Sequence, residues 1–277
     1  MTFKQIFFRV LENVTTIGAG RGPRSGETKV AIDLPAGNGE TATFLLDKGF
    51  QVAAFDLFPE FFKEPRIECQ YCDASAGLPL ADNFGDLLIC QEGLEHFPDQ
   101  LAALKEFNRV LKAQSTLIVT TPNYSSLKHK LSYLLTESER YNRIMAVNEY
   151  DSLWFNRDHN DNQYYGHVFL IGITKLRLLA KIAGFKIRKI HFSELKVSNL
   201  FLFLILYPFI LISSLLTYRR NVRKKPFAKE TYKEILKLNI DPRILIDGSL
   251  IVEFEKEFSL SEAKKALFQI GTYDFKT

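Results

Sequence analysis

Cysteine is scarce in this sequence. The three cysteines are Cys69, Cys72 and Cys90, and such a small, odd number does not build a disulfide framework. Cys69 and Cys72 have the CxxC spacing, but no second pair is present to complete a zinc site. We interpret all three as packing residues on or beside strands, which fits a reducing compartment.

A strong charge of either sign is also missing. The formal net charge of +4 is too weak to argue for a nucleic-acid partner, and we expect none. Hydrophobic residues make up 46% of the chain and charged residues 25%, the composition of an ordinary globular protein. Because 277 residues also suffice for a sizeable core, we do not expect disorder of the whole chain.

The N-terminal stretch MTFKQIFFRVLENV lacks the features of a signal peptide. Charges are scattered through it, and it has neither a long apolar core nor a small-residue cleavage site. The stretch predicts a short amphipathic helix instead, and we expect the protein to stay in the cytoplasm. Internal repeats and low-complexity tracts are absent from the sequence as well.

From Lys29 onward, short apolar runs alternate with helical stretches. Helices are predicted over Glu40–Lys48, Gln100–Lys112 and Thr174–Gly184. The predicted strands are Val30–Leu34, Gln51–Asp56, part of Arg66–Asp73, Asp86–Gln91, Ser115–Pro122, Phe185–His191 and Gly248–Glu255. This alternation predicts an α/β fold with a doubly wound, Rossmann-like, mostly parallel sheet.

Residues 124–166 interrupt the alternation and are predicted to form an inserted cap. The segment is rich in Tyr, Asn and Asp. Its aromatic residues suit a sugar or a ring as a bound acceptor, and they suit ordinary packing of a cap equally well. They are Tyr141, Tyr150, Trp154, Phe155, Tyr164 and Tyr165.

A glycine-rich turn follows the first predicted strand. Gly37 and Gly39 allow a sharp turn and a close approach of a ligand to the backbone. The next helix begins there, and its free N–H groups favour an anionic group. Asp56 ends the second strand, where a carboxylate can accept both hydroxyls of a ribose. The spacing Gly37-x-Gly39-x-x-Ala42 also satisfies the dinucleotide-binding pattern, so NAD is one alternative.

Two further acids favour S-adenosylmethionine (SAM) over NAD. Asp33 ends the first strand, two residues before the loop, where a carboxylate suits the cationic amino group of the methionine part of SAM. The same charge would oppose a pyrophosphate. Asp73 directly follows the third strand, where an acid can accept from the amino group of adenine.

The sequence resembles the class I SAM-dependent methyltransferases, and in particular the ubiquinone-pathway and lipid or glycan methyltransferases. The resemblance rests on residues 30–123, including LPLADNFGDLLICQEGLEHFPDQ, and on a second piece at His167–Phe192, which overlaps the run GHVFLIGITKLRLLAKIAGFKI. It implies that the loop around Pro35 holds the methionine end, although this family usually has glycine at that position. The implied cofactor-binding residues are Asp33, Pro35, Ala36, Gly37 and Gly39 for methionine, Asp56 for ribose, Leu57, Asp73 and Ala74 for adenine, and Gln91 at the methyl-transfer face.

Two histidines are candidate catalytic bases. His96 follows the fourth strand, next to Glu92 and Glu95, at the edge of the sheet where ligands bind. An imidazole with a pKa near neutrality can take a proton from a hydroxyl group. The alternative is that the Glu-His pair only shapes the turn. We expect no metal, although some ubiquinone-pathway relatives bind one. His167 opens the second matching block and either faces the acceptor or closes the cap loop.

Residues 197–217, VSNLFLFLILYPFILISSLLT, contain no charged residue, and basic residues follow directly. The run is long enough to span a bilayer. A single crossing would separate two strands of one sheet, and Pro208 disfavours a straight helix. We therefore predict a shallow hairpin or an in-plane anchor, with residues 197–225 contacting the lipid surface. The alternative is a helix buried in the domain or in a dimer interface.

These features predict one SAM-dependent methyltransferase domain on the cytoplasmic face of a membrane. Its acceptor would be a lipid, a quinone precursor or a lipid-linked sugar, methylated on oxygen. The alternatives are a soluble small-molecule acceptor and an inactive SAM-fold scaffold, and an oligomer is possible. The predicted parts are an N-terminal lead-in (1–28), a SAM-binding half (29–123), the cap (124–166), a second half (167–256) and a C-terminal tail (257–277).

Overall fold

The computed structural model describes residues 2–17, 28–74, 76–138, 146–155, 163–193 and 197–270. The chain forms two compact units. The first, here called the sheet unit, comprises Phe7–Thr121, Arg177–His191 and Ile251–Thr277. The second, the helical unit, comprises Met1–Ile6, Pro122–Leu176 and Phe192–Leu250.

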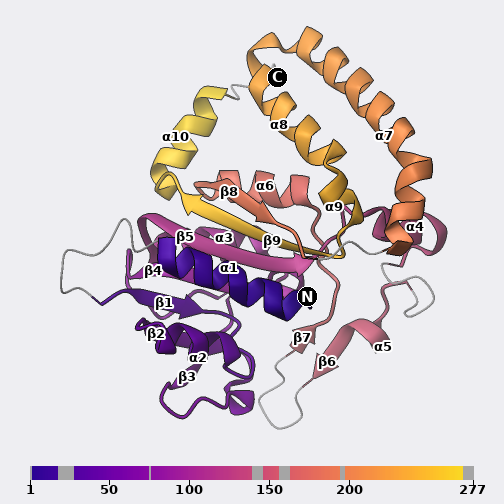
Figure 1. Ribbon diagram of the computed structural model, residues 1–277. Coiled ribbons are helices and arrows are strands. Elements are labelled where there is room, and N and C mark those ends of the chain that lie inside the picture. The colour runs from indigo at the N-terminus through magenta and orange to yellow at the C-terminus, as the bar shows by residue number, and fades with distance from the viewer. Residues whose placement is uncertain are drawn as a thin grey trace. The chain divides into compact units, whose positions relative to one another are not determined.

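A seven-stranded sheet organises the sheet unit (Figure 1). The pairs β1–β2, β1–β4, β2–β3 and β4–β5 are parallel, and β8–β9 is antiparallel. The mostly parallel, Rossmann-like sheet predicted from the sequence is therefore confirmed. Its strands, in spatial order, are β3 (Cys69–Tyr71), β2 (Gln51–Asp56), β1 (Val30–Asp33), β4 (Gly85–Gln91), β5 (Leu111–Pro122), β9 (Ser249–Lys256) and β8 (Phe185–His191).

The central strands are buried on both faces. Ile32, Leu88 and Ile118 are fully inaccessible to solvent, and they belong to three neighbouring strands. Continuous apolar runs of this kind are typical of parallel strands that helices cover on both sides. The middle of the sheet is therefore the core of this unit.

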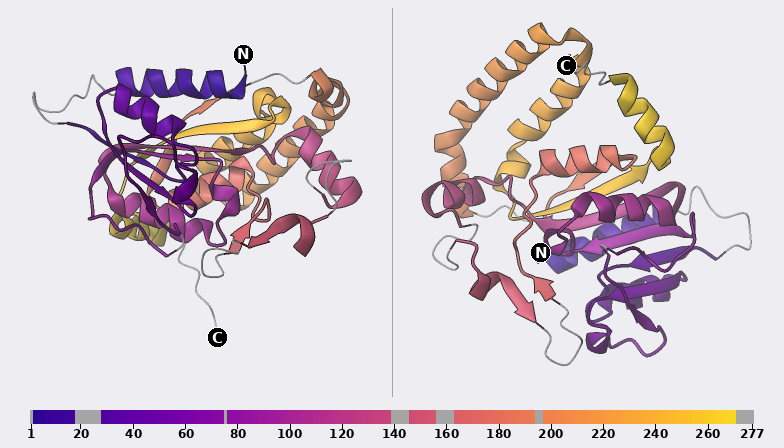
Figure 2. Two further views of the ribbon diagram at one scale, coloured as in Figure 1. Left: turned by 90° about the horizontal axis from the view of Figure 1, so that it is seen from below. Right: turned by 180° about the vertical axis from the view of Figure 1, so that it is seen from behind.

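Helices cover the two faces of the sheet. From Phe7 onward, α1 (Phe3–Ile17) packs beside α2 (Glu40–Asp47), and the rings of Phe8 and Phe44 lie 5.2 Å apart. The predicted amphipathic N-terminal helix is thus confirmed. On the other face, α3 (Gln100–Val110) contacts α10 (Leu260–Ile270), as Figure 2 shows. α6 spans Ile173–Ile182.

The helical unit contains a hairpin and a group of packed helices. The hairpin joins β6 (Leu153–Phe155) to β7 (Gln163–Tyr165). The long helix α7 contacts α4, α8 and α9. The helices of this unit are α4 (Leu127–Thr136), α5 (Glu149–Ser152), α7 (Val197–Lys224), α8 (Lys229–Ile240) and α9 (Pro242–Ile246).

Two details differ from the sequence-based expectation. α3 ends at Val110 and β5 begins at Leu111, four residues before the predicted Ser115, because Leu111 is fully buried and pairs with Gly85. Pro208 lies inside α7 without ending it. A proline removes one backbone donor from a helix, and the other turns of this long helix keep their hydrogen bonds.

Candidate functional site

The loop after β1 is held between the two neighbouring strands. The backbone N–H of Leu34 donates to Ile89 O of β4 at 3.0 Å, and that of Ala36 donates to Phe55 O of β2 at 2.9 Å. Gly37 and Gly39 have φ values of 52° and 88°, in the left-handed region that favours glycine. The predicted glycine turn is therefore present, with its backbone fixed between strands. Pro35 follows a cis peptide bond within it.

Asp56 closes this turn from the end of β2. One carboxylate oxygen accepts from the backbone N–H of Gly37 at 2.8 Å, and the other accepts from that of Phe58 at 2.9 Å. The side chain is buried, with 8% of its surface exposed. Each carboxylate oxygen has a second lone pair, so Asp56 can still accept from a bound hydroxyl. Its part in holding the turn was not predicted from the sequence.

Asp33 is a buried carboxylate without a hydrogen-bond partner. It ends β1, is completely inaccessible to solvent, and neither oxygen makes a hydrogen bond to the described residues. Burial raises the pKa of this carboxyl from 3.8 to about 8, and the charge of Asp56 adds to the effect; the nearby backbone N–H of Ala42 partly opposes it without reaching the geometry of a hydrogen bond. An unpaired buried carboxylate is costly, so this position suits a cationic group of a ligand.

The next segment continues along the same edge of the sheet. β2 and β3 are parallel, with Asp56 opposite Tyr71, and the backbone N–H of Cys72 donates to Asp56 O at 2.9 Å. Asp73 therefore follows immediately after the residue that contacts Asp56, and its side chain is exposed. Ala74 is buried, and Leu57 is half-buried.

Gln91 ends β4 and is tied to the helix after the glycine turn. The Thr41 hydroxyl of α2 donates to Gln91 Oε1 at 2.9 Å. Asp33 and Gln91 therefore lie at the carboxyl ends of neighbouring parallel strands, because Asp33 pairs with Ile89, two residues before Gln91. Ligands of open α/β sheets bind at this edge.

The turn after β4 buries a second carboxyl group. Glu95 is fully buried, and neither of its oxygens makes a hydrogen bond to the described residues. Burial, together with the charge of Glu92, raises its pKa to about 8, although Thr121 partly opposes this. Glu92 itself accepts from the Thr120 hydroxyl at 2.9 Å. His96 comes next and is half-buried, and its role as a base remains a prediction.

Comparison with known proteins agrees with this geometry. Residues 32–119, about a third of the chain, match the family described as methyltransferase domain. The match begins inside β1 and ends inside β5, so it covers the glycine turn and the acids at the strand ends. These residues form a class I SAM-dependent methyltransferase domain. The cofactor of the family is SAM, and the orphaned carboxylate of Asp33 fits its cationic amino group.

Individual relatives resemble only part of the chain. A ubiquinone biosynthesis O-methyltransferase of Xanthomonas campestris is 33% identical over 101 residues, which cover 33% of this chain and 42% of that protein. An uncharacterized protein of Methanocaldococcus jannaschii is 27% identical over 133 residues, 48% of this chain and 58% of that protein. The chain thus spans about half the length of the curated relatives it matches.

A solved structure shares the fold of the chain. The SAM-dependent methyltransferase of Archaeoglobus fulgidus superposes with a TM-score of 0.50 at 15% identity, over 88% of this chain and 94% of that one. At this level of identity the likeness concerns the fold alone. The family match and the topology of the sheet together are therefore the evidence for the domain and its fold.

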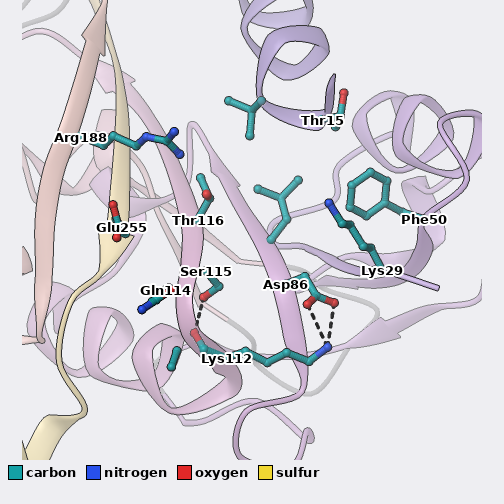
Figure 3. A pocket seen from close by; sticks show the side chains of 13 residues that line it. Thr15, Lys29, Phe50, Asp86, Lys112, Gln114, Ser115, Thr116, Arg188 and Glu255 are labelled. Carbon is teal, nitrogen blue, oxygen red and sulfur yellow. Dashed lines mark hydrogen bonds and ion pairs between the residues drawn. The ribbon is translucent and has the colours of Figure 1, made fainter. Parts of the chain in front are cut away.

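A cavity of about 650 Å³ lies at the other ends of the methyltransferase strands. Its walls include Lys29, Asp86 and Lys112, which precede or begin β1, β4 and β5 (Figure 3). Lys112 Nζ contacts both oxygens of Asp86 at 2.9 Å across this opening. Asp33 and Gln91, two of the predicted cofactor-binding residues, lie at the opposite ends of the same strands and do not line this cavity.

The remaining candidate residues lie in the helical unit. His167 follows β7 and is half-buried, and its catalytic role remains a prediction. The rings of Trp154 and Tyr164 stack at 5.3 Å across the β6–β7 hairpin, and Tyr150 is 87% exposed. Tyr141 lies outside the described residues. Among the described parts of the chain, no three His, Cys, Asp or Glu residues are placed to hold a metal ion.

Proposed function

We propose that the chain is a SAM-dependent methyltransferase that methylates an oxygen atom of a membrane-associated acceptor. The acceptor class comprises lipids, quinone precursors and lipid-linked sugars. The observation that carries the enzymatic part is the meeting of Asp33 and Asp56 beside the glycine turn. One carboxylate is buried and unpaired, and the other closes the turn.

Different residues of the site bind different parts of the cofactor. Asp33 binds the cationic amino group, because ion pairing offsets the cost of burying its own charge. Asp56 accepts from ribose, and Leu57, Asp73 and Ala74 line the adenine side. Pro35, Ala36, Gly37 and Gly39 bring the backbone close to the methionine part. When bound, SAM supplies a methyl group already activated on a sulfonium.

The chain itself must align the acceptor and take up its proton. Gln91 lines the transfer face, where its amide is fixed by Thr41. His96, next to the buried Glu95, is our candidate for the base that accepts the hydroxyl proton, and His167 is the second candidate. Fixing the two reacting groups in line removes much of the entropic cost of the reaction.

Two observations support the choice of acceptor. The Xanthomonas relative is named as an O-methyltransferase of ubiquinone biosynthesis, which favours oxygen and a lipophilic acceptor. Among the described residues, Asn199–Lys224 of α7 form one helix long and apolar enough to cross a membrane, with no part of its apolar window buried in the protein. An exposed apolar helix brings the enzyme to the surface where such acceptors reside.

The test combines cofactor binding with methyl transfer. Calorimetry should detect SAM binding to the intact protein and a loss of about tenfold or more in Asp56→Asn, because a charge-assisted acceptor becomes neutral. Asp47→Asn is the matched control, since Asp47 is exposed and forms an ion pair with Arg66. When the protein is incubated with labelled SAM and a total membrane lipid extract, label should appear in the lipid fraction.

Two results would change the proposal. Binding of SAM without label in any lipid fraction, but with label in a soluble extract, would replace the membrane-associated acceptor by a soluble one. No heat from SAM at millimolar concentration, with Asp56→Asn indistinguishable from the unmodified protein, would favour an inactive scaffold.

A further inference from the structure

One face of α7 is apolar and uncovered within the helical unit. Its members expose between 47% and 69% of their surface and recur at spacings of one to four residues along the helix. They are Leu200, Phe201, Leu204, Ile205, Phe209, Ile212 and Leu216, here called the α7 stripe. Soluble proteins rarely expose a contiguous apolar surface of this length unless it binds something.

The other face of α7 is covered. Leu206, Ile210 and Tyr218 are half-buried at spacings of four and eight residues, and α8 packs against α7. Figures 1 and 2 show α8 running back beside α7. The outward side of α8 is charged, with Lys233 and Lys237 exposed. The hairpin of α7 and α8 is therefore apolar on one side and polar on the other.

The topology of the sheet excludes a single membrane crossing by α7. β8 and β9 pair directly, with His191 opposite Ile251, so the intervening chain must leave and return on one side of a membrane. After α7, the return path contains α8, which has 12 residues and is about 18 Å long. A bilayer core of about 30 Å needs about 20 apolar residues. α8 is too short and too charged to cross back.

The end of α7 carries the opposite kind of surface. Its last turns have no acidic residue, and five exposed basic residues follow the stripe. They are Arg219, Arg220, Arg223, Lys224 and Lys225, here called the basic end. Basic residues next to an inserted apolar face attract anionic lipid head groups, at about 1 kcal/mol each near the surface. α4, which contacts α7, adds the exposed Tyr133, Leu134 and Leu135.

We propose that α7 lies in the plane of an anionic membrane, with the α7 stripe among the acyl chains, the basic end among the head groups and α8 facing the water. The charge complementarity of the basic end selects a lipid surface over a second copy of the chain. This inference rests on the membrane part of the proposed function. Vesicle binding is measured without SAM, so methyl transfer can fail without affecting it.

The first test measures flotation with vesicles. The unmodified protein should float with vesicles of phosphatidylcholine and phosphatidylglycerol. Leu204→Glu combined with Phe209→Glu should weaken binding on the order of 100-fold, because two inserted side chains are lost. Thr231→Glu combined with Asn239→Glu is the matched control, since both residues are exposed on α8 and should leave binding unchanged. Equal loss in both double variants would contradict the orientation.

The second test separates charge from insertion. Arg219→Gln combined with Arg223→Gln should weaken binding to anionic vesicles about tenfold and should remove the preference over pure phosphatidylcholine. An unchanged preference would overturn the assigned role of the basic end. If the unmodified protein stays with the buffer and elutes as a dimer that Leu204→Glu with Phe209→Glu dissociates, the stripe is an interface between copies.

The third test measures depth. Trp154 is the one tryptophan of the sequence, so Trp154→Phe removes the native tryptophan fluorescence. A single tryptophan can then be introduced elsewhere as a fluorescent probe. Phe201→Trp and Leu216→Trp should be quenched to the same extent by lipids brominated at each depth, because both belong to the stripe of an in-plane helix. In a spanning helix the two positions would differ in depth by about 22 Å. Different depth profiles would overturn the in-plane orientation.

Discussion

The sheet unit buries its short apolar segments, whereas the helical unit exposes part of its long apolar segment. The apolar residues 87–90 of β4 and Ile32 of β1 form short segments, and they are buried in the sheet core. α7 contains the longest apolar run of the chain, yet its stripe is exposed. Burial depends on how many elements pack around a segment. The comparison teaches that hydrophobicity marks a segment for contact with something apolar, which need not be the same protein.

A buried amide of the helical unit and two buried carboxyl groups of the sheet unit differ in their hydrogen-bond partners. In the helical unit, Asn123 is buried and donates to Ile244 O at 2.7 Å and to Asp247 O at 2.9 Å. In the sheet unit, Asp33 and Glu95 are buried without such partners. Satisfied groups stabilise a fold, whereas unsatisfied ones destabilise it until a ligand arrives. We therefore expect a ligand at the strand ends beside Asp33 and a structural role for Asn123.

The largest expected effect comes from the glycine turn. Gly39→Val should reduce SAM affinity on the order of 100-fold, the loss of about two charge-assisted hydrogen bonds, because φ is 88° and a Cβ atom would meet the Phe62 ring at 2.9 Å. Gly49→Val is the control, with φ of 85° and no atom within 4 Å of a Cβ. Calorimetry should find its affinity unchanged. Similar losses in both would mean that backbone strain alone acts.

Asp33→Asn should lower the affinity for SAM and, at high pH, raise the stability of the unliganded protein. SAM affinity should fall about tenfold to 100-fold, because a neutral amide replaces the partner of a cation. The unliganded native state keeps the Asp33 proton up to pH about 8, whereas the unfolded chain releases it near 3.8. The free energy of unfolding therefore falls as the pH rises between these values.

Thermal unfolding of the unliganded protein measures the stability side of this prediction. Asp33→Asn should melt higher than the unmodified protein at pH 9 and should differ less from it at pH 5, because part of the decline with pH is removed. Glu95, with a pKa of about 8, should retain the rest of the decline. A lower melting temperature for Asp33→Asn at pH 9 would contradict the unpaired state of this carboxyl.

In the helical unit, Asn123→Ala should lower the free energy of unfolding by about 1–3 kcal/mol, because the carbonyls of Ile244 and Asp247 lose a buried donor. Denaturant unfolding followed by circular dichroism measures this change. Asn239→Ala, on the exposed side of α8, should change the value by less than about 0.5 kcal/mol. Equal effects would remove the contrast between satisfied and unsatisfied buried groups.

The smallest expected effect is at the cavity beside the amino ends of the strands. Lys112→Met removes a half-exposed ion pair with Asp86 and should change stability by less than about 1 kcal/mol. SAM affinity should remain unchanged in calorimetry, because the predicted cofactor-binding residues lie at the other ends of the strands. A clear loss of affinity would show that this cavity communicates with the site.

The fold was predictable because local signals and tertiary structure agree. Asp33 and Gly37 follow an apolar strand, and the alternation of strands and helices fixes them at the carboxyl edge of a parallel sheet. The predicted start of β5 was wrong, because Leu111 continues the apolar spacing of α3. Only its pairing with Gly85 shows that Leu111 belongs to the strand. The burial of Glu95 could not be predicted, since its short turn has no sequence periodicity.

The sequence by itself determined the order of the strands along the chain, the glycine turn and the acids at the strand ends, because these depend on patterns over a few residues. Only the tertiary structure decided that Asp56 fastens the turn, that Asp33 is unpaired and that one face of α7 is covered by α8. Partners of a side chain come from segments far away in sequence, and local pattern carries no information about them.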